Sequence, residues 1–195
     1  MKKLIILSAI LFSGVTYGQK LVLTPNGLRD SLNREKSYVV LNIEGKSTKQ
    51  LYDNTVKYIN KNYTHPKEAI KGQADGEYLK YVTQVTDSIS FKRCFLTEKY
   101  DMDYTIELNF KDGKVKFEII DLDMTQRTQI HMNKRTTTGV NHLLVVGNSR
   151  NLGVFTCKGN LKRADAKAQI EQYFNNQISQ LVSALSGDSK KVDNW

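Results

Sequence analysis

The stretch YTIELNFKDGKVKFEI, residues 104–119, predicts a β-hairpin. Asp112-Gly113 is a strong two-residue turn signal between two runs that alternate apolar and polar residues. Pairing Lys111 with Lys114 puts the apolar side chains of both strands on one face, and an unbroken register then sets Tyr104 opposite Asp121. The hairpin therefore predicts an antiparallel sheet that is covered on one face only.

Helices are predicted on either side of this hairpin in the chain. Ser37–Ile43 is a β-branched run typical of a strand, and Ser47 to Gln50 fits a capping box that starts a helix. That helix should end before His65-Pro66, because proline disfavours helical backbone in the residue before it. A second helix is predicted over residues 162–186, with Gly187 at the position that favours glycine after a helix.

Further strands fill the space between the two helices. Residues 69–72 should pair with 77–85 across an Asp-Gly turn, and Ile89, Phe91 and Phe95 indicate another strand. Residues 125–139 are polar and predict a loop, and a second hairpin is expected between 142–147 and 153–158. The order of elements predicts an α+β two-layer sandwich, an antiparallel sheet with two helices packed on one face.

Residues 1–18 have the layout of a secretory signal peptide. Lys2 and Lys3 precede an apolar stretch over residues 4–12, and Thr16 and Gly18 supply the small residues of a cleavage site after Gly18. The alternative is a buried N-terminal helix. We expect a periplasmic or secreted protein, and no later stretch is apolar enough for an integral membrane protein.

The rest of the chain predicts one domain. We expect an entry segment over residues 19–36, a domain over 37–187 with an inserted loop or hairpin at 126–158, and a flexible tail over 188–195. The 195-residue chain has a formal net charge of +9, and without the two lysines of the first 18 residues it has +7. Such a charge favours anionic partners or serves solubility alone, and interspersed charges favour the second interpretation.

The hairpin, the stretch YVVLNIEGKSTKQLYDNTVKYINKNY (38–63) and the stretch IEQYFNNQISQLVSAL (170–185) together resemble one family. It is the exported bacterial domain of unknown function with a TATA-box-binding-protein-like fold. The resemblance implies that fold and export, and it implies no catalytic residues. Residues 126–158 are longer than a plain version of the fold needs. The fold name does not imply nucleic acid as a partner, because Asp103, Glu107 and Glu118 on the open face would repel phosphate.

Residues for metal or catalytic chemistry are scattered. His65, His131 and His142 form no ligand pair, so we expect no metal site and no cofactor. Asp101 and Asp103 should point to one sheet face and Asp121 and Asp123 to the other, which disfavours calcium. The chain lacks the nucleophile motif G-x-S-x-G, and Glu107 opposite Glu118 is interpreted as an exposed pair. No catalytic residue is assigned.

Two features leave alternatives open. Cys94 and Cys157 would form a disulfide in an oxidising compartment, or remain as two buried free thiols. A basic patch would form if the inserted loop folds back beside the final helix, and otherwise its residues are a solvated charged surface. The residues of this patch are Lys134, Arg135, Lys158, Lys162 and Arg163.

These observations favour an exported, non-enzymatic interaction module in the cell envelope. Its partner would be an anionic envelope component or an envelope protein. The alternatives are a hydrolase that acts on envelope material, with unidentified catalytic residues, and a subunit of an envelope assembly joined through a sheet edge.

Overall fold

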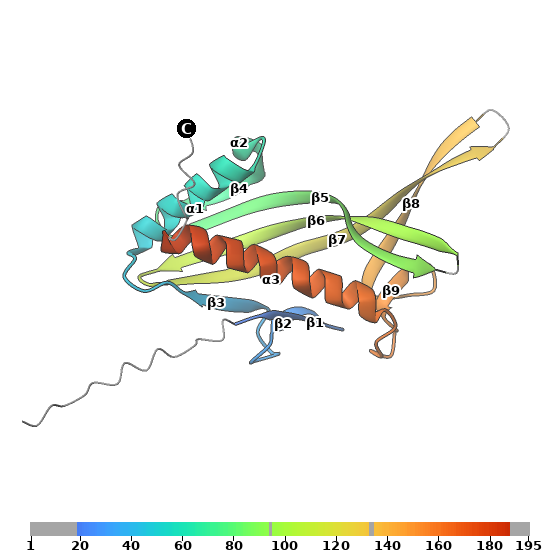
Figure 1. Ribbon diagram of the computed structural model, residues 1–195, viewed down its shortest axis with the longest axis horizontal. Coiled ribbons are helices and arrows are strands. Elements are labelled where there is room, and N and C mark those ends of the chain that lie inside the picture. The colour runs from blue at the N-terminus through green and yellow to red at the C-terminus, as the bar shows by residue number, and fades with distance from the viewer. Residues whose placement is uncertain (1–18, 94, 133–134, 188–195) are drawn as a thin grey trace, which may run out of the picture.

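The computed structural model describes residues 19–93, 95–132 and 135–187. Within these residues, seven strands form one sheet, two long helices cover one of its faces, and two short strands form a separate sheet (Figure 1). The predicted α+β sandwich is confirmed. The elements are β1 (Leu21–Thr24), β2 (Gly27–Asp30), β3 (Tyr38–Asn42), α1 (Thr48–Asn62), α2 (Pro66–Ala69), β4 (Ile70–Ala74), β5 (Tyr78–Arg93), β6 (Leu96–Lys111), β7 (Lys114–Met132), β8 (Arg135–Val146), β9 (Leu152–Phe155) and α3 (Ala164–Ser186).

The predicted hairpin is the centre of the sheet, where β6 pairs with β7. Lys111 lies opposite Lys114, and the predicted register continues without a shift to Thr105 opposite Ile120. Side chains on the covered face, such as Leu108 and Phe117, are completely buried. The other edge of β7 pairs with β3 near the turn and with β8 further along, so β7 organises most of the sheet.

A β-bulge in β7 ends the predicted register. Asp121 has a φ of 54°, and pairing resumes with Asp103 opposite Asp123. Two residues of β7 therefore face one of β6, so the prediction that Tyr104 lies opposite Asp121 is wrong. An extra residue on one strand bends it and increases its twist.

A second irregularity lies in β5 at nearly the same level. Pairing with β6 passes from Val85 opposite Met102 to Ile89 opposite Tyr100, and Asp87 between them has a φ of 50°. The backbone N–H of Asp87 donates to the carboxylate of Asp101 across this gap, at 2.9 Å. The separate strand predicted near Ile89 is thus the continuation of β5. Beyond the two bulges, the β5–β6 and β7–β8 hairpins diverge (Figure 1).

The start of α1 is tied to the turn between β6 and β7. The predicted capping box is present, with Ser47 accepting from the N–H of Gln50 and Gln50 accepting from the N–H of Ser47. Thr48 donates to Asp112 from its backbone N–H and from its hydroxyl, each at 2.7 Å. These hydrogen bonds lower the pKa of Asp112, and the one from the backbone N–H has the larger effect. The turn therefore positions the helix.

The final helix, α3, covers the sheet along its length (Figure 1). It begins at Ala164, two residues later than predicted, and Gly187 follows it with a φ of 82°, as expected for the glycine after a helix. Its buried stripe is the predicted one, Ile170, Phe174, Ile178, Leu181 and Leu185. No helix in the described ranges combines the length and the apolar character needed to cross a bilayer.

The predicted entry segment is part of the core. Residues 19–36 contain the hairpin β1–β2, and its Leu21, Leu23 and Leu28 join the main hydrophobic cluster. The amide of Asn175 on α3 accepts from the N–H of Leu21 and donates to its carbonyl, both at 2.9 Å. The side-chain amide of Asn175 therefore satisfies the backbone edge of β1 as a neighbouring strand would.

Asn175→Ala should destabilise the protein, because it leaves both backbone groups of Leu21 without their partner. We expect the free energy of unfolding to fall by about 1–3 kcal/mol, measured by urea unfolding. The exposed neighbour on the same helix gives the control, Asn176→Ala, which should change it by less than about 0.5 kcal/mol. Equal effects of the two substitutions would contradict the role assigned to Asn175.

Buried tyrosines join α1 and α3 to the sheet. The hydroxyls of Tyr104 and Tyr173 are 2.7 Å apart, and the Tyr63 hydroxyl lies 2.7 Å from that of Thr83. Burial raises the pKa of Tyr63 to about 12, and burial together with the hydrogen bond to Tyr173 raises that of Tyr104. These phenols therefore stay protonated in the folded protein at a pH that ionises an exposed tyrosine.

Stability should fall between about pH 10 and pH 12. The tyrosines of the unfolded chain lose their protons near pH 10, whereas Tyr63 keeps its proton to about pH 12. In this window the folded state binds more protons than the unfolded state. The stabilisation that the protonated Tyr63 gives the folded state is therefore complete below pH 10 and is lost as pH rises. Tyr63→Phe should cost about 1 kcal/mol at pH 8 and make the alkaline fall shallower, as urea unfolding across this range would measure. An unchanged slope would contradict the assignment.

Candidate functional site

The net positive charge of the chain arises in one segment. Residues 124–164 contain no aspartate or glutamate, and we call them the basic segment. The rest of the chain after residue 18 has 20 basic and 20 acidic residues, so this segment carries the whole +7. The interpretation that the charges are interspersed is therefore wrong. Its basic residues are Arg127, Lys134, Arg135, Arg150, Lys158, Lys162 and Arg163.

The basic segment forms one end of the molecule. It comprises the end of β7, β8, β9 and the connection to α3 (Figure 1). The polar loop predicted over residues 125–139 is wrong, because β7 and β8 pair from Thr125 opposite His142 to Met132 opposite Arg135. The pairing of β6 with β7 ends at Thr125, so the two strands continue as a ribbon. Val154 and Phe155 of β9, by contrast, are buried in the main hydrophobic core.

The strands β8 and β9 are parallel, and the predicted hairpin across residues 148–151 is wrong. Leu143 lies opposite Leu152 and Val146 opposite Phe155, so residues 147–151 turn back beside β8 before the chain enters β9. The backbones of Gly147 and Gly153 meet where the chain crosses itself. A Cβ atom on Gly153 would lie 2.0 Å from the nitrogen of Gly147. Two glycines thus permit a connection that side chains would block.

Gly153→Ala should disrupt this crossing, because the added methyl group would overlap the backbone of Gly147. We expect a loss of about 3 kcal/mol or more in the free energy of unfolding, seen as a lower melting temperature. A matched control is Gly72→Ala in β4, where the added carbon would make ordinary contacts at 3.6 Å or more. If Gly153→Ala were as stable as this control, the parallel arrangement would be contradicted.

The connection between β9 and α3 holds three basic residues. Arg163 is half-buried, lies over the ring of Phe91 at 4.9 Å and donates to the carbonyl of Gly153 at 3.1 Å. The backbone N–H groups of Lys162 and Arg163 donate to Val154, which fixes the connection against β9. Lys158 and Lys162 are exposed, and neither forms an ion pair with a described residue. Arg163 is therefore structural, and the two lysines are available to a partner.

A small polar cavity lies where the two hairpins separate. Its volume is about 130 Å³, below the 300–1,000 Å³ typical of ligand pockets. Beside it, Nδ1 of His142 lies 3.2 Å from a carboxylate oxygen of Asp123. The cavity is lined by Glu98, Tyr100, Gln126, Asn141, His142, Arg150, Asn151 and Leu152. Sequence reasoning missed Arg150, and the signal that identifies it is the absence of acidic residues from the surrounding sequence, residues 124–164.

A larger groove lies between α1 and α3. Its volume is about 620 Å³, and its described lining contains no acidic residue. Lys57 and Lys61 supply the charges, and the remaining lining is Asn54, Tyr58, Asn62, Ser179, Gln180, Ser183, Ala184 and Gly187. Anionic ligands are therefore compatible with this groove as well.

The structure brings together only some residues of the predicted basic patch. Lys158, Lys162 and Arg163 lie in one connection, whereas Arg135 lies opposite Met132 at the far end of the ribbon. The loop does not fold back beside α3, because its residues are paired in β7 and β8. Lys134 lies outside the described residues.

The cysteines are described only in part. Cys157 is exposed and its thiol is free, so the alternative of a buried thiol is wrong for this residue. Cys94, the partner in the predicted disulfide, lies outside the described residues, as do the predicted signal peptide over residues 1–18 and the predicted tail over residues 188–195.

The acidic residues considered for calcium are rearranged by the bulge in β7. Asp123 lies opposite Asp103, so these two share a face with Asp101, and the prediction that they point apart is wrong. One oxygen of Asp101 accepts from the backbone of Asp87. In the described part of the chain, no group of three or more histidine, cysteine, aspartate or glutamate side chains could hold a metal ion.

The two glutamates on the open sheet face have other partners. Glu107 accepts from the Tyr78 hydroxyl at 3.2 Å, and Glu118 forms a 2.7 Å ion pair with Lys116 and accepts from the hydroxyl of Ser37. Burial alone would raise the pKa of Glu118, but these two hydrogen bonds and the charges of Lys116 and Arg29 lower it overall. The carboxylate therefore stays ionised in the folded protein.

Residues 38–125 match the family model described as "Domain of unknown function (DUF4468) with TBP-like fold". The resemblance drawn from the sequence is confirmed. The match covers α1 and the central strands and ends at residue 125, one residue after the start of the basic segment. The matched residues contain 13 basic and 14 acidic residues, so the charge of the basic segment lies beyond them.

The chain is also similar to two solved structures. One is a DUF4468 family protein from Bacteroides ovatus, with 16% identity and a TM-score of 0.49 over 77% of this chain and 84% of that one. The other is a TBP-like protein from Parabacteroides distasonis, with 12% identity and a TM-score of 0.46 over 76% of this chain and 90% of that one. A search of curated proteins finds no match to the chain.

Proposed function

We propose that this protein is an exported, non-enzymatic interaction module, and that its basic segment binds an anionic component of the bacterial cell envelope. The observation that carries the proposal is the segregation of charge. One segment has seven basic residues and no acidic residue, and the rest of the chain after residue 18 is neutral. A field of one sign attracts ligands of the other sign and raises their rate of association.

The exposure of the lysines supports the same proposal. Lys158 and Lys162 flank Leu161 on a connection that is hydrogen-bonded to β9, so their backbone position is fixed. Because they form no ion pair within the described residues, binding an anion requires no described ion pair to break. Exposed charges lose little solvation on contact with a wet anionic surface, but salt screens their attraction.

The proposal predicts that charge reversal in the basic segment weakens binding to a soluble polyanion. For Lys158→Glu with Lys162→Glu, we expect at least a tenfold loss of affinity for polyphosphate at low salt, measured by calorimetry. Wild-type affinity should fall steeply as salt is added, because the attraction is electrostatic.

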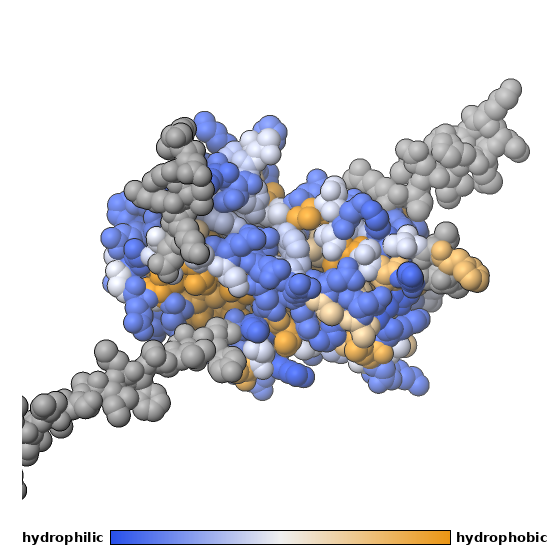
Figure 2. All heavy atoms as spheres, viewed as in Figure 1, coloured by the Kyte–Doolittle hydropathy of each residue, from blue (hydrophilic) through white to orange (hydrophobic). Residues whose placement is uncertain are grey.

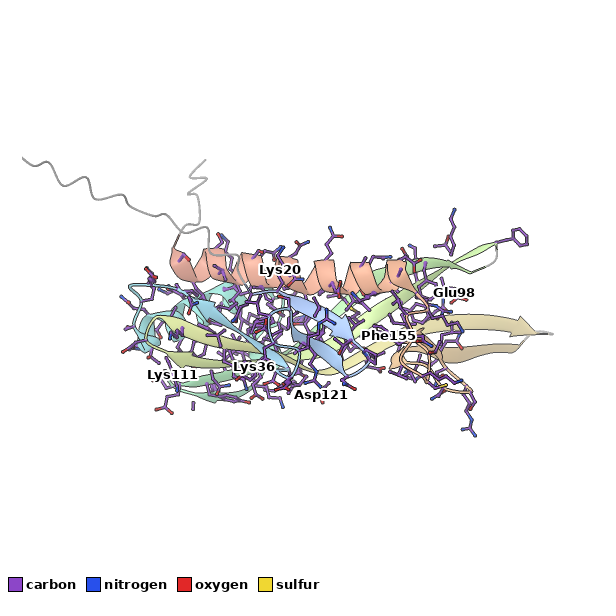
Figure 3. All side chains as sticks on the ribbon, turned by 90° about the horizontal axis from the view of Figure 1, so that it is seen from below. Lys20, Lys36, Glu98, Lys111, Asp121 and Phe155 are labelled. Atoms are coloured by element: carbon purple, nitrogen blue, oxygen red, sulfur yellow. The ribbon has the colours of Figure 1, made fainter. Side chains whose placement is uncertain are left out.

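A control pair with the same change in charge lies at the opposite end of the molecule. Lys111 and Lys114 are exposed and flank the β6–β7 turn, far from Glu98 and Phe155 (Figure 3). Lys111→Glu with Lys114→Glu should reduce the affinity much less than the Lys158 and Lys162 pair. A third pair, Lys57→Glu with Lys61→Glu, tests the groove between α1 and α3. Equal losses in the first two pairs, or a loss confined to the groove pair, would contradict binding through the basic segment.

A further inference from the structure

Three of the four large apolar side chains exposed in the described ranges lie at the end that holds the basic segment. They are Phe95, Val140 and Leu161, and the fourth is Leu32 in the connection between β2 and β3. Val140 and Leu161 belong to the basic segment itself and are about half exposed. Apolar and basic side chains thus occur together at this end, and neither kind is explained by the packing of the fold.

Phe95 is the most exposed of these residues. It lies in the turn between β5 and β6, next to the pair formed by Arg93 and Leu96, and its relative exposure is 103%. Figure 2 shows apolar atoms protruding beyond the hydrophilic surface at the tip of this hairpin. A buried phenylalanine contributes roughly 1.5–3 kcal/mol, so a fully exposed one at a turn forgoes that stabilisation unless a partner covers it.

The β5–β6 hairpin is fixed to the connection that carries the lysines. Arg163 lies over Phe91, and Gln169 on α3 accepts from the backbone N–H of Ser90 and donates to its carbonyl, at 2.9 and 2.7 Å. Phe95 follows Phe91 by four residues in the same hairpin, which projects past the start of α3 (Figure 1). The hairpin that carries Phe95 and the connection that carries Lys162 therefore lie at the same end of the molecule.

The acidic groups near this surface are few and already engaged. Asp87 forms a 2.7 Å ion pair with Lys99, and Glu98 accepts from the hydroxyl of Tyr100 at 3.1 Å. Asp165, at the start of α3, accepts from the backbone of Ala166 at 2.9 Å. Lys92 is exposed on the hairpin beside the tip and adds a further positive charge. The basic residues at this end, Lys92, Lys99, Lys158, Lys162 and Arg163, outnumber these three acidic residues, so the surface favours an anionic partner.

A partner that is both anionic and apolar satisfies this combination. A polyanion in water would engage the lysines but would leave Phe95 in solvent. A bilayer with anionic headgroups offers negative charge at its surface and apolar chains just beneath it, and stable attachment to a bilayer needs both kinds of contact. Phenylalanine is also among the residues with which interfacial helices enter the boundary between headgroups and acyl chains.

We propose that this end of the protein docks on the surface of an anionic lipid bilayer, with Phe95 inserted at the boundary between headgroups and acyl chains. Lys158 and Lys162 contact the headgroups, and Leu161 between them lies against the same surface. This inference rests on the proposed function and names its anionic component. It describes attachment to one face of a bilayer, without a membrane-spanning segment.

The test compares Phe95→Ser with a matched control, both made in the protein that comprises residues 19–195. The control is Leu32→Ser, which removes another exposed apolar side chain, 75% exposed, from a different part of the molecule. With phosphatidylcholine vesicles that contain phosphatidylglycerol, we expect Phe95→Ser to bind about tenfold more weakly in sedimentation assays, and Leu32→Ser to bind as the wild type does. Neither substitution should change the affinity for polyphosphate.

The outcomes separate the two proposals. If Phe95→Ser binds anionic vesicles as the wild type does, or loses polyphosphate binding equally, the bilayer inference is overturned. The proposed function would still stand if reversing Lys158 and Lys162 abolished polyphosphate binding. If that reversal changed neither vesicle nor polyphosphate binding, both proposals would fail.

A second measurement reports insertion directly. Phe95→Trp is made in a chain whose one tryptophan, Trp195, is replaced by phenylalanine. Vesicles with bromine atoms in the upper part of the acyl chains should quench the fluorescence of the new tryptophan, because bromine quenches only at short range. A fluorescence unchanged by brominated lipid, under conditions in which the protein sediments with the vesicles, would overturn the insertion of this residue.

Discussion

The pairing of β6 with β7 is the constraint on which the rest of the structure depends. Its register decides which side chains enter the core, because a slip of one residue would expose Leu108 and Phe117 together. The same hairpin positions the first helix, since Asp112 in its turn accepts two hydrogen bonds from Thr48. Strand β7 then pairs with β3 near the turn and with β8 at its far end, so one strand joins the covered sheet to the basic segment.

The bulges at Asp87 and Asp121 divide this sheet into two parts. On one side, the strands pack under α1 and the C-terminal part of α3. On the other side, the hairpins diverge and the chain carries its net charge. A neutral, closely packed body thus supports an end with basic residues and exposed apolar side chains. The division explains how one domain combines an ordinary core with a surface suited to an anionic layer.

Local patterns predicted much of this fold, and contacts between distant residues account for what they missed. The turn at Asp112-Gly113, the capping box at Ser47 and the stripe on α3 are each encoded within a few residues, and each was found. The bulges were missed because an aspartate in an alternating strand gives no sign that its φ is positive. The parallel β9 depends on the meeting of Gly147 and Gly153, and the basic segment becomes visible only when acidic residues are counted along the whole chain.

The clamp between α3 and β1 has a consequence for how the chain matures. The backbone N–H groups of Leu21 and Leu23 donate to side-chain oxygens of Asn175 and Glu171, which follow them by 154 and 148 residues. The first strand to leave the ribosome therefore waits for the last helix before it is secured, and contacts so distant in sequence form slowly. Late docking of β1 is compatible with the proposed export, in which the chain would cross a membrane before it folds.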